Sequence, residues 1–155
     1  MPLSVPLNIV LYQPEIPQNT GNIGRTCVAL GAKLWLVRPL GFLVDDRHLR
    51  RAGLDYWQHL QWDVVDHWAQ LETRLPDLKP WFFSKRADRL YTDVEYQPAD
   101  VLVFGCETQG LPESWLARHA DRAVRIPISA NVRSLNLANA VAVAAYEAVR
   151  QWHAS

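Results

Sequence analysis

The chain has 155 residues, of which 49% are hydrophobic and 21% charged, a composition that predicts one folded domain over residues 1–155 and excludes intrinsic disorder. Sixteen basic residues balance sixteen acidic ones, so the formal net charge is zero; this excludes a protein that coats nucleic acid through bulk positive charge, though not a local basic patch. Two cysteines, Cys27 and Cys106, are too few for a disulfide framework, and the first residues carry neither a basic leader nor an apolar run long enough for a membrane span, so we expect a soluble cytoplasmic protein.

Short apolar runs alternate along the chain with longer segments of helical periodicity. Nearly continuous apolar runs are typical of strands buried on both faces of a parallel sheet. The alternation therefore favours an α/β fold, with a mostly parallel sheet flanked by helices. In chain order we predict strand 7–12, helix 20–30, strand 34–37, helix 45–52, strand 60–65, helix 67–75, strand 81–84, strand 101–104, helix 112–119, strand 123–126 and helix 135–152.

Local signals mark the ends of two of these helices. Asn19 or Thr20 can cap the start of the first helix, and Gly31 can end it. Asp66 can cap the third helix, and Pro76 stops it because proline cannot continue a helix. These boundaries leave each of the two helices between two predicted strands.

The last predicted helix is apolar over more than one face. A helix that is apolar nearly all round is buried on more than one side. The pattern fits either a central helix inside one core or a helix shared with a second subunit, and its small side chains would allow another helix to approach closely. The apolar positions are Leu137, Ala140, Val141, Val143, Ala144, Ala145, Ala148, Val149 and Trp152.

Three polar segments follow predicted strands, where ligands bind in open α/β sheets. The first covers residues 14–25 and leads into a helix, with Arg25 about one and a half turns inside it. Free amide groups at a helix N-terminus favour phosphate binding. Gly21 and Gly24 are only three residues apart and fail the dinucleotide-binding fingerprint. Taken alone, this segment is better explained as a capped helix with a surface arginine.

The second segment, residues 104–112, directly follows a predicted strand. Gly105 and Gly110 flank a short polar turn, which permits positive φ angles and a close backbone approach to a ligand. Between them, the Glu107 carboxylate can accept a hydrogen bond from a ribose or an amine, or orient an arginine. Cys106 lies in no nucleophile-elbow pattern and has no histidine near it in sequence, so we interpret it as a small packing residue, with a reactive thiol as the alternative.

The third segment, residues 126–140, runs from a strand end through a polar loop into the last helix. Ser134 is the predicted N-cap of that helix. Capping does not explain Asn136 and Asn139, because buried amides on an otherwise apolar helix need hydrogen-bond partners. The five histidines show no metal-ligand spacing, so we expect no catalytic metal.

Taken together and in this order, the three segments resemble the motifs of SPOUT-class RNA 2′-O-ribose methyltransferases. The matching stretches are residues 19–25, 104–112 and 126–140, and with residues 45–56 they most resemble the compact tRNA (cytidine/uridine-2′-O)-methyltransferases, which modify the wobble nucleotide 34. The resemblance implies an α/β fold with a C-terminal trefoil knot, S-adenosylmethionine as methyl donor, and a homodimer through the C-terminal helix whose active site uses both subunits. Residue patterns alone would exclude a knot, because knots are very rare.

The resemblance also implies which residues form the site. The implied catalytic residues are Asn19, Arg25, Glu107, Ser134 and Asn136. The implied cofactor-binding residues are Phe83, Gly105, Ile126, Ser134 and Leu135. Gly105 and Ile126 would offer backbone groups to the adenosine. The family often has proline or serine in place of Cys106 and arginine in place of Gln109, and the second departure removes a possible phosphate contact.

In the implied reaction a ribose 2′-hydroxyl attacks the sulfonium methyl, so positioning and charge stabilisation should dominate catalysis. A guanidinium with a pKa above about 12 is a poor base, so we expect Arg25 to stabilise the developing alkoxide and the adjoining phosphate, with Glu107 orienting Arg25 or the hydroxyl. The expected RNA-binding residues are Arg47, Arg50, Arg51, Lys85 and Arg86. Methylation of another tRNA or rRNA site, and a non-catalytic RNA-binding dimer of the same fold, are the alternatives.

Overall fold

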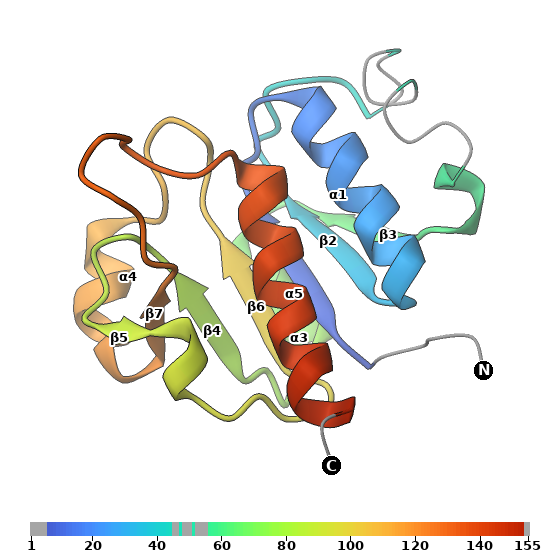
Figure 1. The fold of residues 1–155 in the computed structure, drawn as a ribbon. Helices are drawn as coiled ribbons and strands as arrows, with labels where there is room; N and C mark the ends of the chain where they lie inside the picture. Colours follow the sequence, from blue (N-terminus) through green and yellow to red (C-terminus); the bar gives the residue numbers. More distant parts are fainter. Residues whose placement is uncertain (1–5, 45–46, 48–50, 52–55, 154–155) are drawn as a thin grey trace.

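A parallel β-sheet forms the centre of the computed structural model, which describes residues 6–44, 47, 51 and 56–153 (Figure 1). Its seven strands have the order β3-β2-β1-β6-β4-β7-β5, and every neighbouring pair is parallel. The predicted α/β class is confirmed, while the trefoil knot stays a prediction. The strands are β1 (Asn8–Tyr12), β2 (Lys33–Val37), β3 (Gln61–Val65), β4 (Pro80–Phe83), β5 (Arg89–Leu90), β6 (Val101–Phe104) and β7 (Ala123–Arg125). The α-helices are α1 (Pro17–Leu30), α3 (Trp68–Arg74), α4 (Glu113–Arg118) and α5 (Leu137–His153).

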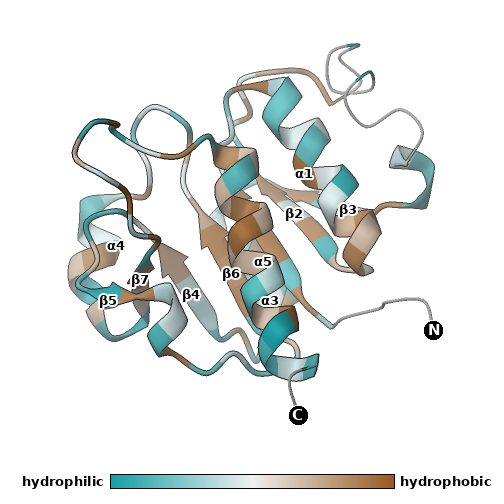
Figure 2. Cartoon of the chain, in the orientation of Figure 1, coloured by the Kyte–Doolittle hydropathy of each residue, from teal (hydrophilic) through white to brown (hydrophobic). Residues whose placement is uncertain are grey.

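The strands contribute side chains to two hydrophobic cores, one on each face of the sheet. In β1, Ile9 and Leu11 pack with residues of α1 and α5, whereas Val10 between them packs in the other core with α3 and α4. Figure 1 shows α1 and α5 in front of the sheet, and Figure 2 shows hydrophobic strands behind them. Helices cover both faces, which explains why the strands are apolar along their length.

The six predicted strands agree with the structure to within one residue at each end. The strand β5, which pairs with β7 at the edge of the sheet, was not predicted. It has only two residues, Arg89 and Leu90, and a strand this short carries no detectable alternation of polar and apolar side chains.

Helix α1 begins at Pro17, three residues earlier than predicted, so the prediction that Asn19 or Thr20 caps it is wrong. Proline suits the first helical position because its φ is already helical and it lacks the amide hydrogen that a cap would satisfy. The N-cap is Ile16, which makes no side-chain cap hydrogen bond. The predicted end is confirmed, since Gly31 adopts a left-handed conformation with φ of 71°.

Helix α3 is capped by His67, and the predicted cap Asp66 is wrong by one residue. The His67 Nδ1 atom accepts a hydrogen bond from the Gln70 backbone N–H at 3.2 Å, the reach that an N-cap side chain needs. The Asp66 carboxylate instead accepts a hydrogen bond from Arg38 on the surface. The helix predicted over residues 45–52 lies largely outside the described residues.

Helix α5 begins at Leu137, so Ser134 lies outside it and is not its cap. The Asn136 Oδ1 atom accepts the Asn139 backbone N–H at 3.2 Å and takes that role. Both asparagines are exposed, which corrects the expectation that they are buried amides. Capping therefore explains Asn136, and Asn139 faces solvent.

The body of α5 packs beside α1 on the same face of the sheet, against β6, but leaves two apolar side chains exposed. Val143 is 39% exposed and Tyr146 is 48% exposed. Most of α5 is therefore buried in the core of this chain, which agrees with the interpretation of a central core helix. Its exposed side also presents apolar side chains. The buried residues of α5 are Val141, Ala144, Ala145, Glu147, Ala148 and Val149.

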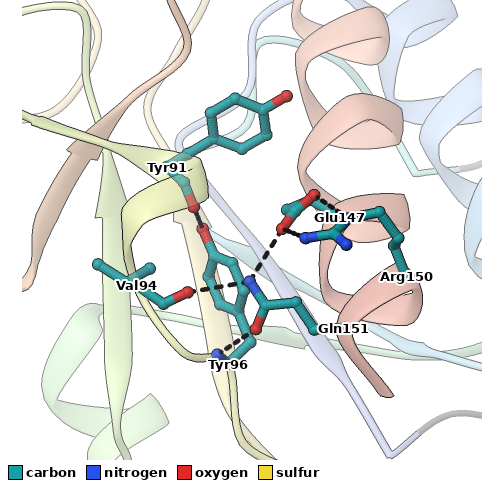
Figure 3. A network of polar contacts seen from close by, with 6 residues as sticks. All are labelled: Tyr91, Val94, Tyr96, Glu147, Arg150 and Gln151. Atoms are coloured by element: carbon teal, nitrogen blue, oxygen red, sulfur yellow. Dashed lines mark hydrogen bonds and ion pairs between the residues drawn. The ribbon is translucent and has the colours of Figure 1, made fainter. Parts of the chain in front are cut away.

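Polar contacts fasten the last turns of α5 to the segment that precedes β6 (Figure 3). Gln151 accepts the Tyr96 backbone N–H and donates to the Val94 carbonyl, both at 2.9 Å. Arg150 donates two hydrogen bonds of 2.9 Å to Glu147, and Gln151 donates a third. The hydrogen bonds from Arg150 lower the pKa of Glu147. We call these five residues the α5 network.

Candidate functional site

A cleft of about 780 Å³ opens at the carboxyl edge of the sheet. Because the strands are parallel, the segments that follow β1, β4, β6 and β7 leave the sheet at this edge, and all of them contribute to the cleft. Its volume lies within the range of small-molecule binding sites. The predicted catalytic and cofactor-binding residues that line it are Asn19, Phe83, Gly105, Glu107, Ile126, Ser134, Leu135 and Asn136, and the predicted RNA-binding residues Lys85 and Arg86 line it too.

The loop after β6 folds back so tightly that Gly105 has no room for a side chain. A Cβ atom there would lie 2.1 Å from the Gly110 carbonyl carbon and 2.2 Å from the Leu111 nitrogen. Gly110 adopts φ of 69°, and its N–H donates to the Cys106 carbonyl at 2.9 Å to close the turn. The glycine turn is confirmed, but the backbone that approaches Gly105 closely belongs to the loop itself.

Glu107 holds the start of α1 with both of its carboxylate oxygens. The Glu15 backbone N–H donates to Oε1, and the Ile16 N–H donates to Oε2, each at 2.8 Å. The Asn19 side-chain amide donates to Oε2 at 3.3 Å. Glu107 thus orders the first motif segment from a position about 90 residues later in the chain, and a negative charge near the N-terminus of α1 is favourable.

Glu15, which the sequence analysis did not single out, makes the reverse contact. Its Oε1 atom accepts the Thr108 backbone N–H at 2.9 Å and the Thr108 hydroxyl at 2.7 Å. The hydrogen bond from the Thr108 hydroxyl is the main cause that lowers the pKa of Glu15. The only sequence signal was an acidic residue in the polar segment ahead of the predicted helix, and a surface role explained it equally well.

An amide relay joins the first and third motif segments. The Asn136 Nδ2 atom donates to Asn19 Oδ1 at 3.0 Å, while Asn19 donates to Glu107. Asn136 Oδ1 in turn accepts the Asn139 N–H that starts α5. Each amide therefore has its donor and acceptor sides fixed by its partners, and Glu107, Asn19 and Asn136 form one rigid chain across the cleft.

Arg25 lies away from this relay. Its guanidinium stacks over the ring of Tyr56, 4.6 Å from the ring centroid, and Nη2 donates to the Tyr56 hydroxyl at 3.3 Å. In the described part of the chain Glu107 accepts hydrogen bonds from residues 15, 16 and 19 and forms neither a hydrogen bond nor a salt bridge with Arg25, and Arg25 does not line the cleft. Tyr56 is a further residue that the sequence analysis did not assign to the site.

The cleft has an apolar wall beside the polar relay. Phe83 and Phe104 stack with their ring centroids 4.7 Å apart and an interplanar angle of 19°. Leu111 and Ile126 also line the cleft. An apolar wall with a few fixed polar groups is the usual composition of a site for a nucleoside-sized ligand.

Basic side chains surround the cleft, but some are already engaged. Lys85 donates to the Arg133 carbonyl at 2.9 Å, and Arg86 forms a salt bridge with Glu113. Arg133 lines the cleft and was not predicted as a site residue. Of the other predicted RNA-binding residues, Arg47 and Arg51 are exposed and Arg50 lies outside the described residues.

Potential metal ligands and the two cysteines form no second candidate site in the part of the chain that is described. No three His, Cys, Asp or Glu side chains there lie close enough together to hold a metal ion. Cys27 is buried, and burial raises its pKa to about 12, whereas Cys106 lines the cleft with Sγ 3.9 Å from the Gly110 carbonyl oxygen. None of the described helices has the length and apolar character needed to span a bilayer.

Comparison with known proteins identifies the family. Residues 6–146 match the SpoU rRNA Methylase family, and this range includes all three motif segments. The chain belongs to the SpoU methylase family. This match, together with relatives named tRNA (cytidine(34)-2′-O)-methyltransferase, confirms the resemblance to SPOUT-class methyltransferases that the three motif segments indicate.

Individual relatives agree with this membership. A tRNA (cytidine(34)-2′-O)-methyltransferase of Saccharophagus degradans is 46% identical over 151 residues, which cover 93% of this chain and 94% of the relative. A solved structure that gives insights into the 2-OH methylation of C/U34 on tRNA superposes with a TM-score of 0.91 at 49% identity, covering 96% of this chain and 97% of that one. The SpoU methyltransferase AviRb of Streptomyces viridochromogenes, solved with S-adenosylmethionine, superposes with a TM-score of 0.87 at 26% identity and covers 99% of this chain and 64% of that one.

Proposed function

We propose that the protein transfers a methyl group from S-adenosylmethionine to the ribose 2′-hydroxyl of nucleotide 34, a cytidine or uridine, in tRNA. The observation that carries this proposal is the rigid relay of Glu107, Asn19 and Asn136, which joins all three motif segments inside one cleft. The relatives named above support the tRNA substrate and the position of the modified nucleotide.

The cleft residues fit S-adenosylmethionine. The stacked rings of Phe83 and Phe104 provide an apolar wall for an adenine, and the backbone at Gly105 and Ile126 provides hydrogen-bonding groups that can read its edge. Ser134 and Leu135 lie on the loop that would close over it. When bound, S-adenosylmethionine supplies a methyl group on a positively charged sulfur.

Glu107 acts as a positioning residue. Its oxygens already accept three hydrogen bonds from neutral donors, so its task is to hold Asn19 and the start of α1 in place. Asn19, Asn136 and Ser134 would then orient the ribose, so that its 2′-hydroxyl oxygen points toward the methyl group that S-adenosylmethionine would supply. Fixed orientation of this kind contributes a large share of catalysis in a displacement that needs little covalent help.

Arg25 stabilises charge on the substrate. Its guanidinium cannot act as a base near neutral pH, but it can pair with the developing alkoxide and the neighbouring phosphate. Because its hydrogen bond to Tyr56 is long and its side chain is exposed, Arg25 can leave Tyr56 when RNA binds. Arg25→Ala and Arg25→Lys should both reduce turnover at saturating cofactor by about 100-fold, since Arg25 and Lys differ in bidentate geometry.

The RNA-binding surface consists of Arg47, Arg50, Arg51, Lys85 and Arg86, and binding should weaken as salt rises. We place the protein in the cytoplasm and infer a homodimer through α5, because Val143 and Tyr146 on that helix are exposed apolar side chains. A dimer would double the basic surface and bring residues of both subunits to each cleft.

Transfer of tritium from labelled S-adenosylmethionine to bulk tRNA tests this function, followed by mapping of the methylated nucleotide. The expected result is one 2′-O-methylated nucleotide at position 34. Methylation at another tRNA or rRNA position would mean that the substrate differs from the proposed one, although the reaction is the same. Binding of tRNA without binding of S-adenosylmethionine would indicate a non-catalytic RNA-binding protein and contradict the proposal.

A further inference from the structure

Two carboxylates join the loop before α1 to the loop after β6. Each carboxylate belongs to one loop and accepts hydrogen bonds from the other. Glu107 accepts the N–H groups of Glu15 and Ile16, and Glu15 accepts the N–H and the hydroxyl of Thr108. We call this reciprocal pair, formed by Glu15, Ile16, Glu107 and Thr108, the clasp. The residues it joins are 91 to 93 positions apart in the chain.

The two halves of the clasp differ in burial. In the Glu107 half, the hydrogen bond from the Glu15 N–H is partly buried and the one from the Ile16 N–H is exposed, whereas in the Glu15 half both hydrogen bonds from Thr108 are exposed. If Glu15 were removed, water could satisfy the exposed N–H and hydroxyl of Thr108. Loss of this half should therefore change the position of the loop more than the stability of the fold.

Position matters here because the same loop lines the cleft. At the base of this loop, Gly105 packs against the Gly110 backbone. Thr108 lies at the exposed tip of the loop, next to Glu107 in the chain. The contact with Glu15 is the side-chain bond that ties this tip to the start of α1. Asn19, which Glu107 orients, lies one helical turn further along α1.

We propose that Glu15 is a positioning residue for methyl transfer, which holds Thr108 so that Glu107 keeps Asn19 and the cofactor-lining loop in register. The proposal rests on the proposed function for its activity readout. It assigns a role to a side chain outside the motif residues, and it predicts that Glu15 and Thr108 act as one unit.

Steady-state kinetics of Glu15→Ala, Thr108→Val and the double variant test this role. Each single variant should lower kcat at saturating cofactor about tenfold, the size expected for one charge-assisted contact, with the KM for tRNA within about twofold of the parent value. The double variant should lose no more than Glu15→Ala alone, because that change already removes the hydroxyl hydrogen bond that Thr108→Val removes. Thr108→Ser keeps both donors and should restore near-parental turnover.

Asp63→Ala is the matched control. Asp63 also accepts hydrogen bonds, from Lys33 at 2.7 Å and Arg74 at 3.1 Å, but it lies on the edge strand β3 and does not line the cleft. It should leave kcat unchanged. Parental kcat in Glu15→Ala, or losses that multiply in the double variant, would overturn the proposal.

Amide hydrogen exchange provides a readout that is independent of activity. In Glu15→Ala the amides of Thr108 and Ile16 should both exchange faster, the second because Glu107 has moved. Unchanged protection of Ile16 would contradict the coupling between the two halves. If the parent protein transfers no methyl group, the proposed function fails, and this measurement still decides whether Glu15 positions Glu107.

Discussion

Glu107 and Glu147 each accept three hydrogen bonds, but from different kinds of donor. Glu147 accepts two from Arg150 and one from Gln151, all within its own helix, so a neighbouring positive charge compensates it. Glu107 accepts all three from neutral groups about 90 residues away, and in the described part of the chain it forms no salt bridge. The Glu147 carboxylate thus pairs with a cation in its own helix, while the Glu107 carboxylate lines the cleft and, among the described residues, pairs with no cationic side chain. We therefore expect the first arrangement to serve stability and the second to serve a ligand.

The largest expected effect is on the loop that carries Glu107. Gly105→Ala would place a Cβ atom 2.1 Å from the Gly110 carbonyl carbon, so the loop must move. A displacement of about 1 Å at a reacting site can reduce catalysis about 100-fold, and we expect at least that loss in methyl transfer. Gly110→Ala is the control, because nothing lies within 4 Å of its Cβ position and only the strain of its φ of 69° opposes the change. Equal losses in the two variants would show that the close packing at Gly105 is unimportant.

The α5 network should instead respond to pH through stability. Hydrogen bonds from Arg150 lower the folded-state pKa of Glu147 below its ordinary value of 4.5. A lowered pKa means that this stabilisation is fully present above about pH 4.5 and is lost as the pH falls through the folded-state pKa. Urea unfolding should therefore show a difference in unfolding free energy between the parent protein and Glu147→Gln at pH 7 that shrinks by pH 3. A difference that is constant with pH would contradict this assignment.

The smallest expected effect concerns a charge pair at the rim of the cleft. Arg86 pairs with Glu113, and both side chains are more than half exposed, at 54% and 81%. Exposed pairs contribute little to stability, so Glu113→Gln should leave unfolding unchanged. It should release Arg86 for RNA phosphate and tighten tRNA binding about two- to threefold at low salt, as measured by filter binding. Weaker binding in this variant would mean that the pair itself holds the RNA-binding surface in shape.

Sequence patterns predicted the sheet well because each strand is buried on both faces. Leu34 to Val37 and Val101 to Phe104 are continuous apolar runs, and both are strands. Helix caps were predicted less well, because the groups that order the start of α1 come from Glu107, far along the chain. No local pattern contains that information.

The site residues divide in the same way. The motif resemblance indicated Asn19, Glu107 and Asn136, and the structure joins them in one relay. The motif resemblance did not indicate Glu15, because its partner Thr108 lies on another loop and only the fold brings the two together. Arg25 was expected beside Glu107, but in the structure it lies over Tyr56.

A paired measurement on Glu107→Gln and Glu147→Gln tests the central contrast most directly. Both variants remove one carboxylate that accepts three hydrogen bonds, and both are measured for methyl transfer to tRNA and for unfolding by urea. We expect Glu107→Gln to lower kcat about 100-fold with little change in unfolding, since an amide cannot accept all three donors. We expect Glu147→Gln to lower the unfolding free energy by about 1–2 kcal/mol and to leave kcat within about twofold. Parental turnover in Glu107→Gln, or the same pattern in both variants, would contradict the account.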